Sequence, residues 1–236
     1  MTLVVGCHFP EGAVILADSR ATWQITGSKN VFQDTLQKLL PLLPTATIAY
    51  AGHVSTATSL INSLSSRILR NNRLKNVGYL GPNVGRFAKH DYQTLQGLSI
   101  NPQPVSFVLA GIDTGRSQAG SGSHEIRLWG YSSPRFRPVE VKHNFVAVGS
   151  GSDVIVPFLT QHWSELAALA GGAHEKANWL IPRLENELER GTDMFVGGLF
   201  QILLIEPVGI RPLNYWRLTL DPDDEVDLLA CRCRKG

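Results

Sequence analysis

Three residues could together supply a nucleophile, its base and stabilisation for a developing alkoxide: Thr2, Asp18 and Lys38. Thr2 is small enough for removal of Met1 to be expected, which would leave a secondary hydroxyl and a free α-amine on one residue. Such an amine titrates at about pH 8, so a good fraction is neutral at physiological pH and can take the hydroxyl proton, directly or through one water. The sequence therefore predicts that Thr2 carries both nucleophile and base.

Asp18 and Lys38 are the charged residues that would assist Thr2. A turn-forming Pro-Glu-Gly after the strand Leu3–Phe9 predicts a hairpin with strand 13–18, whose open end brings residues 2 and 18 roughly opposite each other. Lys38, the only lysine in the next pair of predicted strands, is the natural ammonium. It would stabilise the alkoxide and depress the pKa of the amine, while the Asp18 carboxylate holds it in place.

Apolar periodicity predicts strands at both ends of the chain and helices between them. The predicted strands are Leu3–Phe9, 13–18, 36–43, 46–51, 105–112, 125–131, 144–148, 199–206 and 214–220. The predicted helices are Val54–Arg70, a less regular 84–98, 154–169, and 174–190 with a kink at Pro182, and a loop is predicted at 114–124. Because strict strand-helix alternation is missing, this order favours an α+β fold in which two helix pairs pack on two stacked sheets.

Composition limits the class of protein. The 236 residues are 43% hydrophobic with a formal net charge of +2, and the charges are scattered along the chain. This length predicts a single domain, 1–236, with a flexible tail at about 222–236. The charge pattern indicates neither nucleic-acid nor membrane binding, and the N-terminus lacks the features of a signal peptide. Three cysteines without framework spacing fit a reducing compartment, so we expect a cytoplasmic protein.

Other motifs that could carry chemistry are weaker. The Gly-Ser-Gly at 149–151 follows a predicted strand, but Val154 occupies the third glycine position of a dinucleotide fingerprint. The stretch HEKAN, 174–178, lacks the second histidine of a zinc-binding helix, and Cys231 and Cys233 lack partner ligands. The nucleophile elbow Gly-x-Ser-x-Gly does not occur in the sequence. The sequence thus predicts no metal and no cofactor.

A likeness to a known family is carried by TLVVGCHFPEGAVILADSRAT, QKLLPLLPTATIAYAGHVS and VAVGSGSD, and more weakly by TDMFVGG. In these segments the chain resembles the proteasome β-type N-terminal-nucleophile hydrolases, which include proteasome β subunits, the bacterial HslV peptidase and the ancestral-β-subunit (Anbu) proteins. The spacing from Thr2 to ADSRAT matches the β-subunit pattern without a gap. Lys38 stands a few residues farther along than in that pattern, but its distance to Ala51-Gly52 matches.

The resemblance implies a site, a fold and an assembly. It implies that Thr2 is the nucleophile, that Asp18 and Lys38 are its charge pair, and that the Gly52 N–H is the oxyanion donor. Ser150 and Asp193 are implied to form the supporting hydrogen-bond network. The implied fold is a four-layer αββα sandwich. The implied assembly is a homo-oligomer, either a ring or a helix, and whether an ATPase or other regulator binds it is left open. Apolar helix faces at 54–68 and 154–169, richer than one layer needs, agree with side-by-side packing.

One departure from the family lies in the motif D-x-x-S-G-G, which here is Asp193-Met-Phe-Val196-Gly-Gly. An isopropyl group therefore stands where the family has a hydroxyl that helps to orient the nucleophile. This change could lower activity without abolishing it, because Thr2, Asp18 and Lys38 remain. Arg20, next to these residues, is expected to pair with a carboxylate rather than to contact substrate.

Together these features predict a threonine peptidase that cleaves peptides or unfolded proteins through an acyl-ester on Thr2. A catalytically silent scaffold or regulatory subunit of the same fold, and a non-proteolytic amidase, remain as alternatives. The resemblance maps the substrate side pocket to five uncharged residues, which are Ala21, Leu36, Leu40, Tyr50 and Val54. A pocket without charge, made shallow by Tyr50, favours small or medium neutral residues such as Ala, Val or Leu before the cleaved bond.

Overall fold

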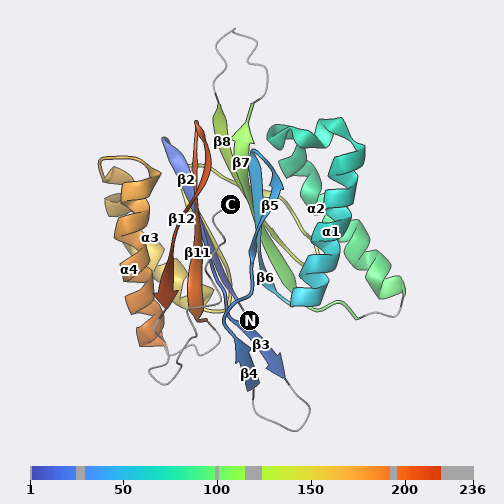
Figure 1. The fold of residues 1–236 in the computed structure, drawn as a ribbon, viewed down its shortest axis with the longest axis horizontal. Coiled ribbons are helices and arrows are strands. Elements are labelled where there is room, and N and C mark those ends of the chain that lie inside the picture. Colours follow the sequence, from blue (N-terminus) through green and yellow to red (C-terminus); the bar gives the residue numbers. More distant parts are fainter. Residues whose placement is uncertain (1, 25–29, 99–100, 115–123, 192–195, 219–236) are drawn as a thin grey trace, which may run out of the picture.

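The computed structural model describes residues 2–24, 30–98, 101–114, 124–191 and 196–218, which are drawn in colour in Figure 1. Three features singled out in the sequence lie wholly or mostly outside these residues: the loop 114–124, Asp193 and the tail 222–236. Within the described part of the chain, no helix is long and apolar enough to cross a membrane.

Five antiparallel strands form the first sheet, in the order β10-β1-β2-β11-β12. They are β1 (Leu3–Phe9), β2 (Gly12–Asp18), β10 (Phe145–Gly149), β11 (Gly198–Glu206) and β12 (Gly209–Leu218). The N-terminal hairpin β1-β2 lies in the middle because β10 and β11 pair with its two edges. Segments far apart in the sequence therefore meet where β1 begins and β2 ends.

A second five-stranded antiparallel sheet has the order β5-β6-β7-β8-β9. Its strands are β5 (Leu39–Leu43), β6 (Ala46–Gly52), β7 (Val105–Asp113), β8 (Glu125–Ser132) and β9 (Val139–Val141). A separate two-stranded ribbon, β3 (Ala21–Gln24) and β4 (Asn30–Gln33), connects the end of β2 to the segment before β5. The chain thus passes from one sheet to the other between residues 18 and 39.

Four helices cover the outer faces of the sheets. They are α1 (Val54–Arg70), α2 (Val77–Gly97), α3 (Ser152–Ala168) and α4 (Ala173–Gly191), with the short 3-10 helix η1 (Asn72–Lys75) between the first two. Figure 1 shows the sheets face to face in the middle, with α3 and α4 outside the first sheet and α1 and α2 outside the second. The predicted α+β, four-layer αββα sandwich is confirmed.

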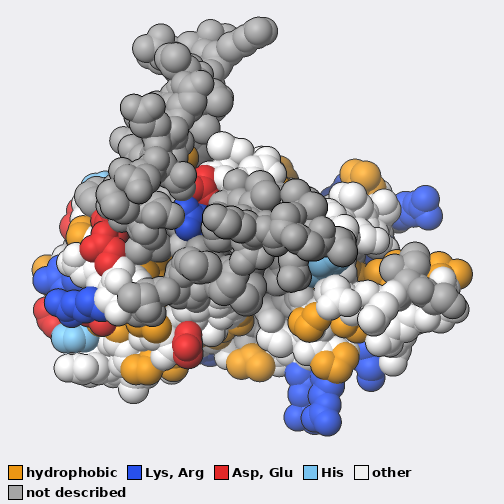
Figure 2. Space-filling model, turned by 90° about the horizontal axis from the view of Figure 1, so that it is seen from below, with side chains coloured by type: hydrophobic (Ala, Val, Ile, Leu, Met, Phe, Trp, Pro, Cys, Tyr) orange, Lys and Arg blue, Asp and Glu red, His pale blue; other side chains and the backbone are white. Residues whose placement is uncertain are grey.

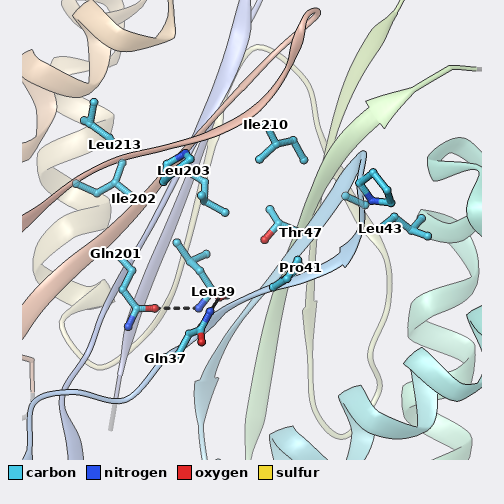
Figure 3. A pocket seen from close by; sticks show the side chains of 13 residues that line it. Gln37, Leu39, Pro41, Leu43, Thr47, Gln201, Ile202, Leu203, Ile210 and Leu213 are labelled. Atoms are coloured by element: carbon cyan, nitrogen blue, oxygen red, sulfur yellow. Dashed lines mark hydrogen bonds between the residues drawn. The ribbon is translucent and has the colours of Figure 1, made fainter. Parts of the chain in front are cut away.

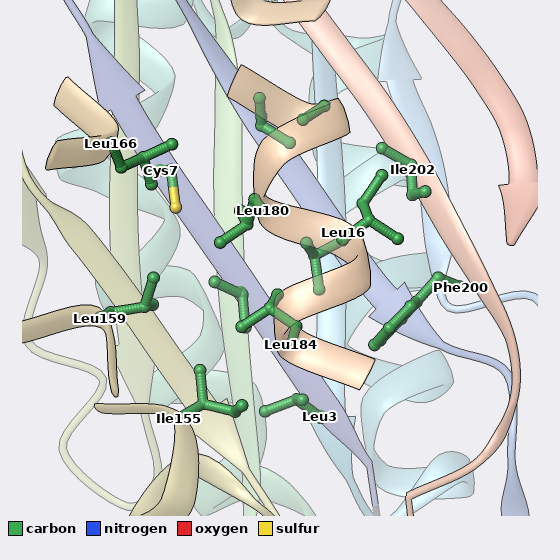
Figure 4. Packing of buried hydrophobic residues seen from close by; sticks show 14 of the residues in the cluster. Leu3, Cys7, Leu16, Ile155, Leu159, Leu166, Leu180, Leu184, Phe200 and Ile202 are labelled. Atoms are coloured by element: carbon green, nitrogen blue, oxygen red, sulfur yellow. The ribbon is translucent and has the colours of Figure 1, made fainter. Parts of the chain in front are cut away.

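Three apolar clusters fill the three interfaces between these layers. Residues of β1 show how strand alternation assigns side chains to them: Leu3, Val5 and Cys7 pack toward α3 and α4, while Val4 packs between the sheets. Figure 4 shows the first of these clusters, in which leucines of α3 and α4 meet the outer face of β1, β2 and β11. Because both faces of the hairpin are covered, every residue of β1 and β2 is buried.

The predicted elements recur in the structure with shifted ends. Helix Val54–Arg70 and strand Leu3–Phe9 have the predicted bounds, and most other elements agree to within two residues. The ribbon β3-β4, strand β9 and η1 were not predicted, since each is three or four residues long and offers little periodicity.

Helix α2 begins at Val77, seven residues before the predicted start at 84, so the prediction was wrong there. Asn76 caps the helix by accepting a hydrogen bond from the Tyr79 N–H. The glycines and the internal Pro82 obscure this start in the sequence. Gly81 is needed for close packing, because a Cβ there would lie 2.4 Å from the Trp129 ring.

Two strands of the prediction also begin at the wrong residue. β5 starts at Leu39 rather than 36, because the Leu36 N–H bonds to the Ser19 carbonyl and the Gln201 side chain takes the Leu36 carbonyl and the Lys38 N–H. β12 starts at Gly209 rather than 214, and it includes Pro212. A proline is tolerated there because β12 is an edge strand of its sheet.

The surface near the site is mixed in character. Figure 2 views the end of the molecule at which β3 and β4 lie, and around its rim hydrophobic side chains stand among acidic and basic ones. The large hydrophobic side chains that are most exposed come from several elements: Leu69, Tyr79, Leu98, Val139, Val156 and Val208. This pattern does not by itself define a contact surface, so the predicted homo-oligomer stays a prediction.

Candidate active site

Thr2 lies at the entrance to β1, held by its main chain. Its carbonyl accepts a hydrogen bond from the Ser150 N–H at 2.8 Å, which extends the β1-β10 pairing by one step. Gly149 has φ +96°, and a Cβ at this position would lie 1.7 Å from the Thr2 carbonyl oxygen. Only glycine therefore lets β10 approach Thr2 this closely. In this chain, which begins with Met1, Thr2 is 2% exposed.

Asp18 and Lys38 form an ion pair that is fully buried directly beside Thr2. Asp18 Oδ1 accepts from Lys38 Nζ at 3.1 Å and from the Leu3 N–H at 2.8 Å. Asp18 Oδ2 accepts from the Gly197 N–H at 3.3 Å, and Lys38 Nζ also donates to the Arg20 carbonyl. The pair is thus tied to the residue that follows Thr2, to the residue before β11 and to the link between β2 and β3.

Burial governs the ionisation of this pair. It lowers the pKa of Lys38 and raises the pKa of Asp18, and the attraction between the two charges opposes both shifts. Since both side chains are 0% exposed, neither charge is compensated by water. A lysine in this setting gives up its proton more readily than one on the surface.

The hairpin register differs by one residue from the prediction that residues 2 and 18 are opposite. The pairs Val4–Ala17, Val5–Leu16 and onward to Phe9–Gly12 place Leu3, not Thr2, opposite Asp18 when the register is continued. The carboxylate consequently reaches the Leu3 N–H, one peptide beyond Thr2.

A second ion pair braces the chain between the two sheets. Arg20 donates to Asp34 through Nε at 2.8 Å and through Nη2 at 2.9 Å, so the prediction that it pairs with a carboxylate is confirmed. Ser19 Oγ donates to the Asp34 carbonyl and accepts from the Leu199 N–H at 2.8 Å. These contacts join the end of β2, the start of β11 and the segment before Lys38.

Gly52 ends β6 at the turn into α1. Its φ is +102°, and a Cβ here would lie 2.4 Å from the Pro104 carbonyl oxygen, so the turn requires glycine. The N–H of the next residue, His53, donates to the Pro104 carbonyl at 3.0 Å. His53 also caps α1, because its side chain accepts from the Thr56 N–H. This turn lies between the predicted strand 46–51 and the predicted helix Val54–Arg70.

Four of the five predicted pocket residues meet in one apolar cluster. Leu36, Leu40, Tyr50 and Val54 all belong to the cluster beneath α1 and α2. Tyr50 is 1% exposed, burial raises its pKa to about 12, and its hydroxyl donates to the Gln37 carbonyl at 3.4 Å. The fifth residue, Ala21, is buried at the start of β3 and belongs to none of the apolar clusters.

A cavity of about 350 Å³ opens between the two sheets at their β5 and β12 edges (Figure 3). Its walls come from β5, β6, β11 and β12 and are mostly apolar, with Gln37, Thr47 and Gln201 as polar members. None of the five predicted pocket residues lines it. The cavity is therefore a different space from the predicted side pocket.

The remaining predicted residues have different outcomes. Ser150 is adjacent to Thr2 through its backbone N–H, and Asp193 lies outside the described residues. Val196 is 0% exposed, and its side chain joins the apolar cluster under α3 and α4. The following residue, Gly197, donates to Asp18. The position that departs from the family motif thus lies one residue from a hydrogen-bond partner of Asp18.

Gln201 is a residue of this region that the sequence analysis missed. It lies in the apolar run LFQILLI of β11, is 7% exposed, and makes three hydrogen bonds to residues 36–39. A buried polar residue inside an apolar strand was the available signal. Its partners could not be read from the sequence, because they lie more than 160 residues away.

The fold and the site define an α+β sandwich in which Thr2 directly precedes the N-terminal strand and a buried Asp-Lys pair is bonded to the first residue of that strand. Residues 2–122, just over half of the chain, match the family model described as proteasome subunit, and the chain belongs to that family. A comparison with curated proteins gave no match. The resemblance predicted from the sequence segments is therefore confirmed at the level of the family.

Proposed function

We propose that this protein is a threonine peptidase that acts through Thr2 after removal of Met1. The observation that carries the proposal is the fully buried Asp18–Lys38 pair, bonded to the Leu3 N–H directly after Thr2. A buried ion pair contributes little net stability compared with apolar side chains of the same size. Its presence beside an N-terminal hydroxyl is explained if the ammonium serves chemistry there.

The proposed reaction has two stages. The freed α-amine of Thr2 takes the proton from its own hydroxyl as Oγ attacks the carbonyl carbon of the substrate, and the Gly52 N–H stabilises the resulting oxyanion. The intermediate collapses to an ester on Oγ, and the leaving amine departs with the proton. A water molecule, deprotonated by the same α-amine, then attacks the ester and releases the acid, which restores the hydroxyl.

Lys38 and Asp18 have electrostatic roles in this scheme. The ammonium of Lys38 stabilises negative charge on Oγ and lowers the pKa of the α-amine, so that more of the amine is neutral. Asp18 fixes the ammonium through Oδ1 and receives backbone N–H groups on both oxygens. Ser150 and Asp193 are proposed to support this network.

Peptides or unfolded proteins are the proposed substrates. The side pocket is proposed to be formed by uncharged residues, with Tyr50 at its floor, and to accept small or medium neutral side chains before the cleaved bond. A pocket without a charge cannot compensate for the burial of Lys, Arg, Asp or Glu. Cleavage of a peptide library mainly after charged residues would contradict this assignment.

The experiment that tests the mechanism is intact-mass detection of acylation by a peptide-like electrophile. The protein whose N-terminus is Thr2 should gain one adduct, mapped to Thr2. Thr2→Ala, and a form with an uncleavable N-terminal extension, should gain none, because one lacks the hydroxyl and the other lacks the basic amine. Equal adduct formation by the extended form would overturn the mechanism.

A silent proteasome-like scaffold is the second candidate, and Val196 favours it. Its side chain is apolar and packed away in the cluster under α3 and α4, where the family has a hydroxyl. A processed protein that forms the assembly but shows no adduct at Thr2 would support this candidate. Members of the proteasome family assemble into oligomers, so a homo-oligomer is proposed for either function. A cytoplasmic location stays a prediction.

A further inference from the structure

We propose that Gln201 is a positioning residue for Lys38: its amide fixes the backbone from which Lys38 reaches Asp18. This inference rests on the proposed function, in which Lys38 assists Thr2. Nothing in the sequence motifs of the site includes Gln201, which lies in a different sheet from the strand that Lys38 precedes.

The contacts of Gln201 are concentrated on the segment around Lys38. Oε1 accepts the N–H of Lys38 at 2.8 Å and that of Leu39 at 3.1 Å, and Nε2 donates to the Leu36 carbonyl at 2.6 Å. Figure 3 shows the Gln201 side chain extending from β11 toward Leu39 across the opening between the sheets. One side chain thus satisfies three backbone groups at residues 36–39, where the chain enters β5.

An amide suits this place better than other side chains of similar length. It offers an acceptor and a donor on one planar group, and here the acceptor faces two N–H groups while the donor faces a carbonyl. A carboxylate would place a second oxygen against the Leu36 carbonyl. A methionine would fill the volume and leave all three backbone groups without this partner.

The backbone position of Lys38 matters because its side chain is enclosed. The Lys38 N–H is held by Gln201, its carbonyl accepts from the Tyr50 N–H at 3.2 Å, and its Nζ reaches Asp18 at 3.1 Å with 0% exposure. A flexible four-carbon stem gives little geometric control by itself. Fixing its origin therefore helps to place the ammonium at Asp18, whose carboxylate also accepts the Leu3 N–H directly after Thr2.

Three variants test this assignment. Gln201→Met removes all three hydrogen bonds, and Gln201→Glu removes only the donor at neutral pH. Gln37→Met is the matched control, because Gln37 also lines the cavity but its side chain bonds only to the Leu39 carbonyl, at 3.1 Å.

The first measurement does not depend on catalysis. Peptide mass spectrometry follows the rate at which acetic anhydride modifies the Lys38 amine in the full-length protein. We expect modification about tenfold faster in Gln201→Met than in wild type, and an unchanged rate in Gln37→Met. Should Gln201→Met fail to fold, Gln201→Glu takes its place. Equal rates in the Gln201 variant and the control overturn the positioning role.

The second measurement uses the processed protein and a peptide substrate. Gln201→Met should lower kcat about tenfold with little change in KM, because the ammonium acts on the reaction rather than on substrate binding. For Gln201→Glu, the ratio of its kcat to that of wild type should rise toward acidic pH, as the protonated carboxyl regains a donor for Leu36. A ratio independent of pH would contradict the inference. If wild type shows no adduct at Thr2, the proposed function fails, and Lys38 modification still decides the role of Gln201.

Discussion

Two lysines are buried in the described part of this protein, and their surroundings differ. Lys38 is 0% exposed and pairs with Asp18, which is also 0% exposed. Lys176, in α4, is 1% exposed, and its Nζ donates to the carbonyls of Ala167 and Leu169 at 3.0 and 2.9 Å. It also pairs at 2.8 Å with Glu11, which is 33% exposed.

The difference shows that burial of a lysine does not by itself indicate a reactive site. The Nζ of Lys176 donates hydrogen bonds to carbonyls at the C-terminal end of α3, where a cation is favourable. It lies 4.9 Å from the Phe9 ring centroid. Its partners are carbonyls at the end of α3 and the Glu11 carboxylate, so Lys176 joins two segments of the fold. Lys38 instead has a carboxylate partner bonded to the peptide after Thr2. We therefore propose a chemical role for Lys38 and a structural role for Lys176.

The strongest test of this contrast is to remove each ammonium in turn. Lys38→Met should slow acylation of Thr2 by roughly 10³-fold, because the charge that stabilises the alkoxide is lost. Lys176→Met should acylate at the wild-type rate when assayed at a temperature at which it is folded. Intact-mass kinetics with one electrophile measures both. Comparable losses in the two variants would remove the distinction.

Stability should show the structural role of Lys176. Lys176→Met leaves carbonyls at the end of α3 without a donor and Glu11 without its cation, so we expect a loss of about 2 kcal/mol in the free energy of unfolding. Urea denaturation measures it. Lys142→Met is the control, because Lys142 is 60% exposed and lies 3.9 Å from its nearest carboxylate. An unchanged midpoint for Lys176→Met would show that the contacts of α3 do not depend on this lysine.

The pH dependence of acylation sharpens the contrast further. The rate should rise as the α-amine loses its proton, below the ordinary α-amine pKa of about 8 because Lys38 lowers it, and fall as the Lys38 ammonium loses its own. Because burial lowers the pKa of Lys38, the fall should begin below the ordinary lysine value of 10.5. The profile of Lys176→Met should be the same as that of wild type. A decline that starts only at the ordinary value would show that the buried ammonium does not control the rate.

The smallest effect is expected for the carboxylate partner of Lys176. Glu11→Gln keeps an oxygen that can accept from Nζ, and the site is partly exposed, so the loss should be roughly 0.5 kcal/mol. Thermal unfolding measured beside Lys176→Met checks it. A loss as large as that of the lysine variant would mean that the ion pair, rather than the helix carbonyls, dominates this region.

Much of the fold could be predicted because most of its helices and strands have patterns that can be recognised within short stretches of sequence. The apolar spacing of α1 and the alternating hairpin around the Pro-Glu-Gly turn are properties of contiguous residues, and both were predicted with the correct or nearly correct bounds. The start of α2 could not be predicted in this way. Its glycines look unfavourable in the sequence, and at Gly81 the reason is close contact with Trp129 of β8.

The candidate site was predicted in its residue types but not in its contacts. Asp18 and Lys38 were expected to pair, and they do, while the register placed Asp18 against Leu3 rather than Thr2. The packing of the Val196 side chain in the apolar cluster under α3 and α4 was not predicted either. Such details depend on which strands become neighbours.

By itself, then, the sequence determined the sandwich, the family and the charged pair that accompanies Thr2. The reason is that short-range periodicity and motif spacing can be recognised from residues close together in the chain. Only the tertiary structure decided that β10 and β11 add to the N-terminal hairpin. That arrangement brings Gly197 to Asp18 and Gln201 to the backbone of Lys38, across 179 and 163 residues of chain. Hydrogen bonds over such separations follow from sheet order, which packing of the whole chain selects and no local pattern encodes.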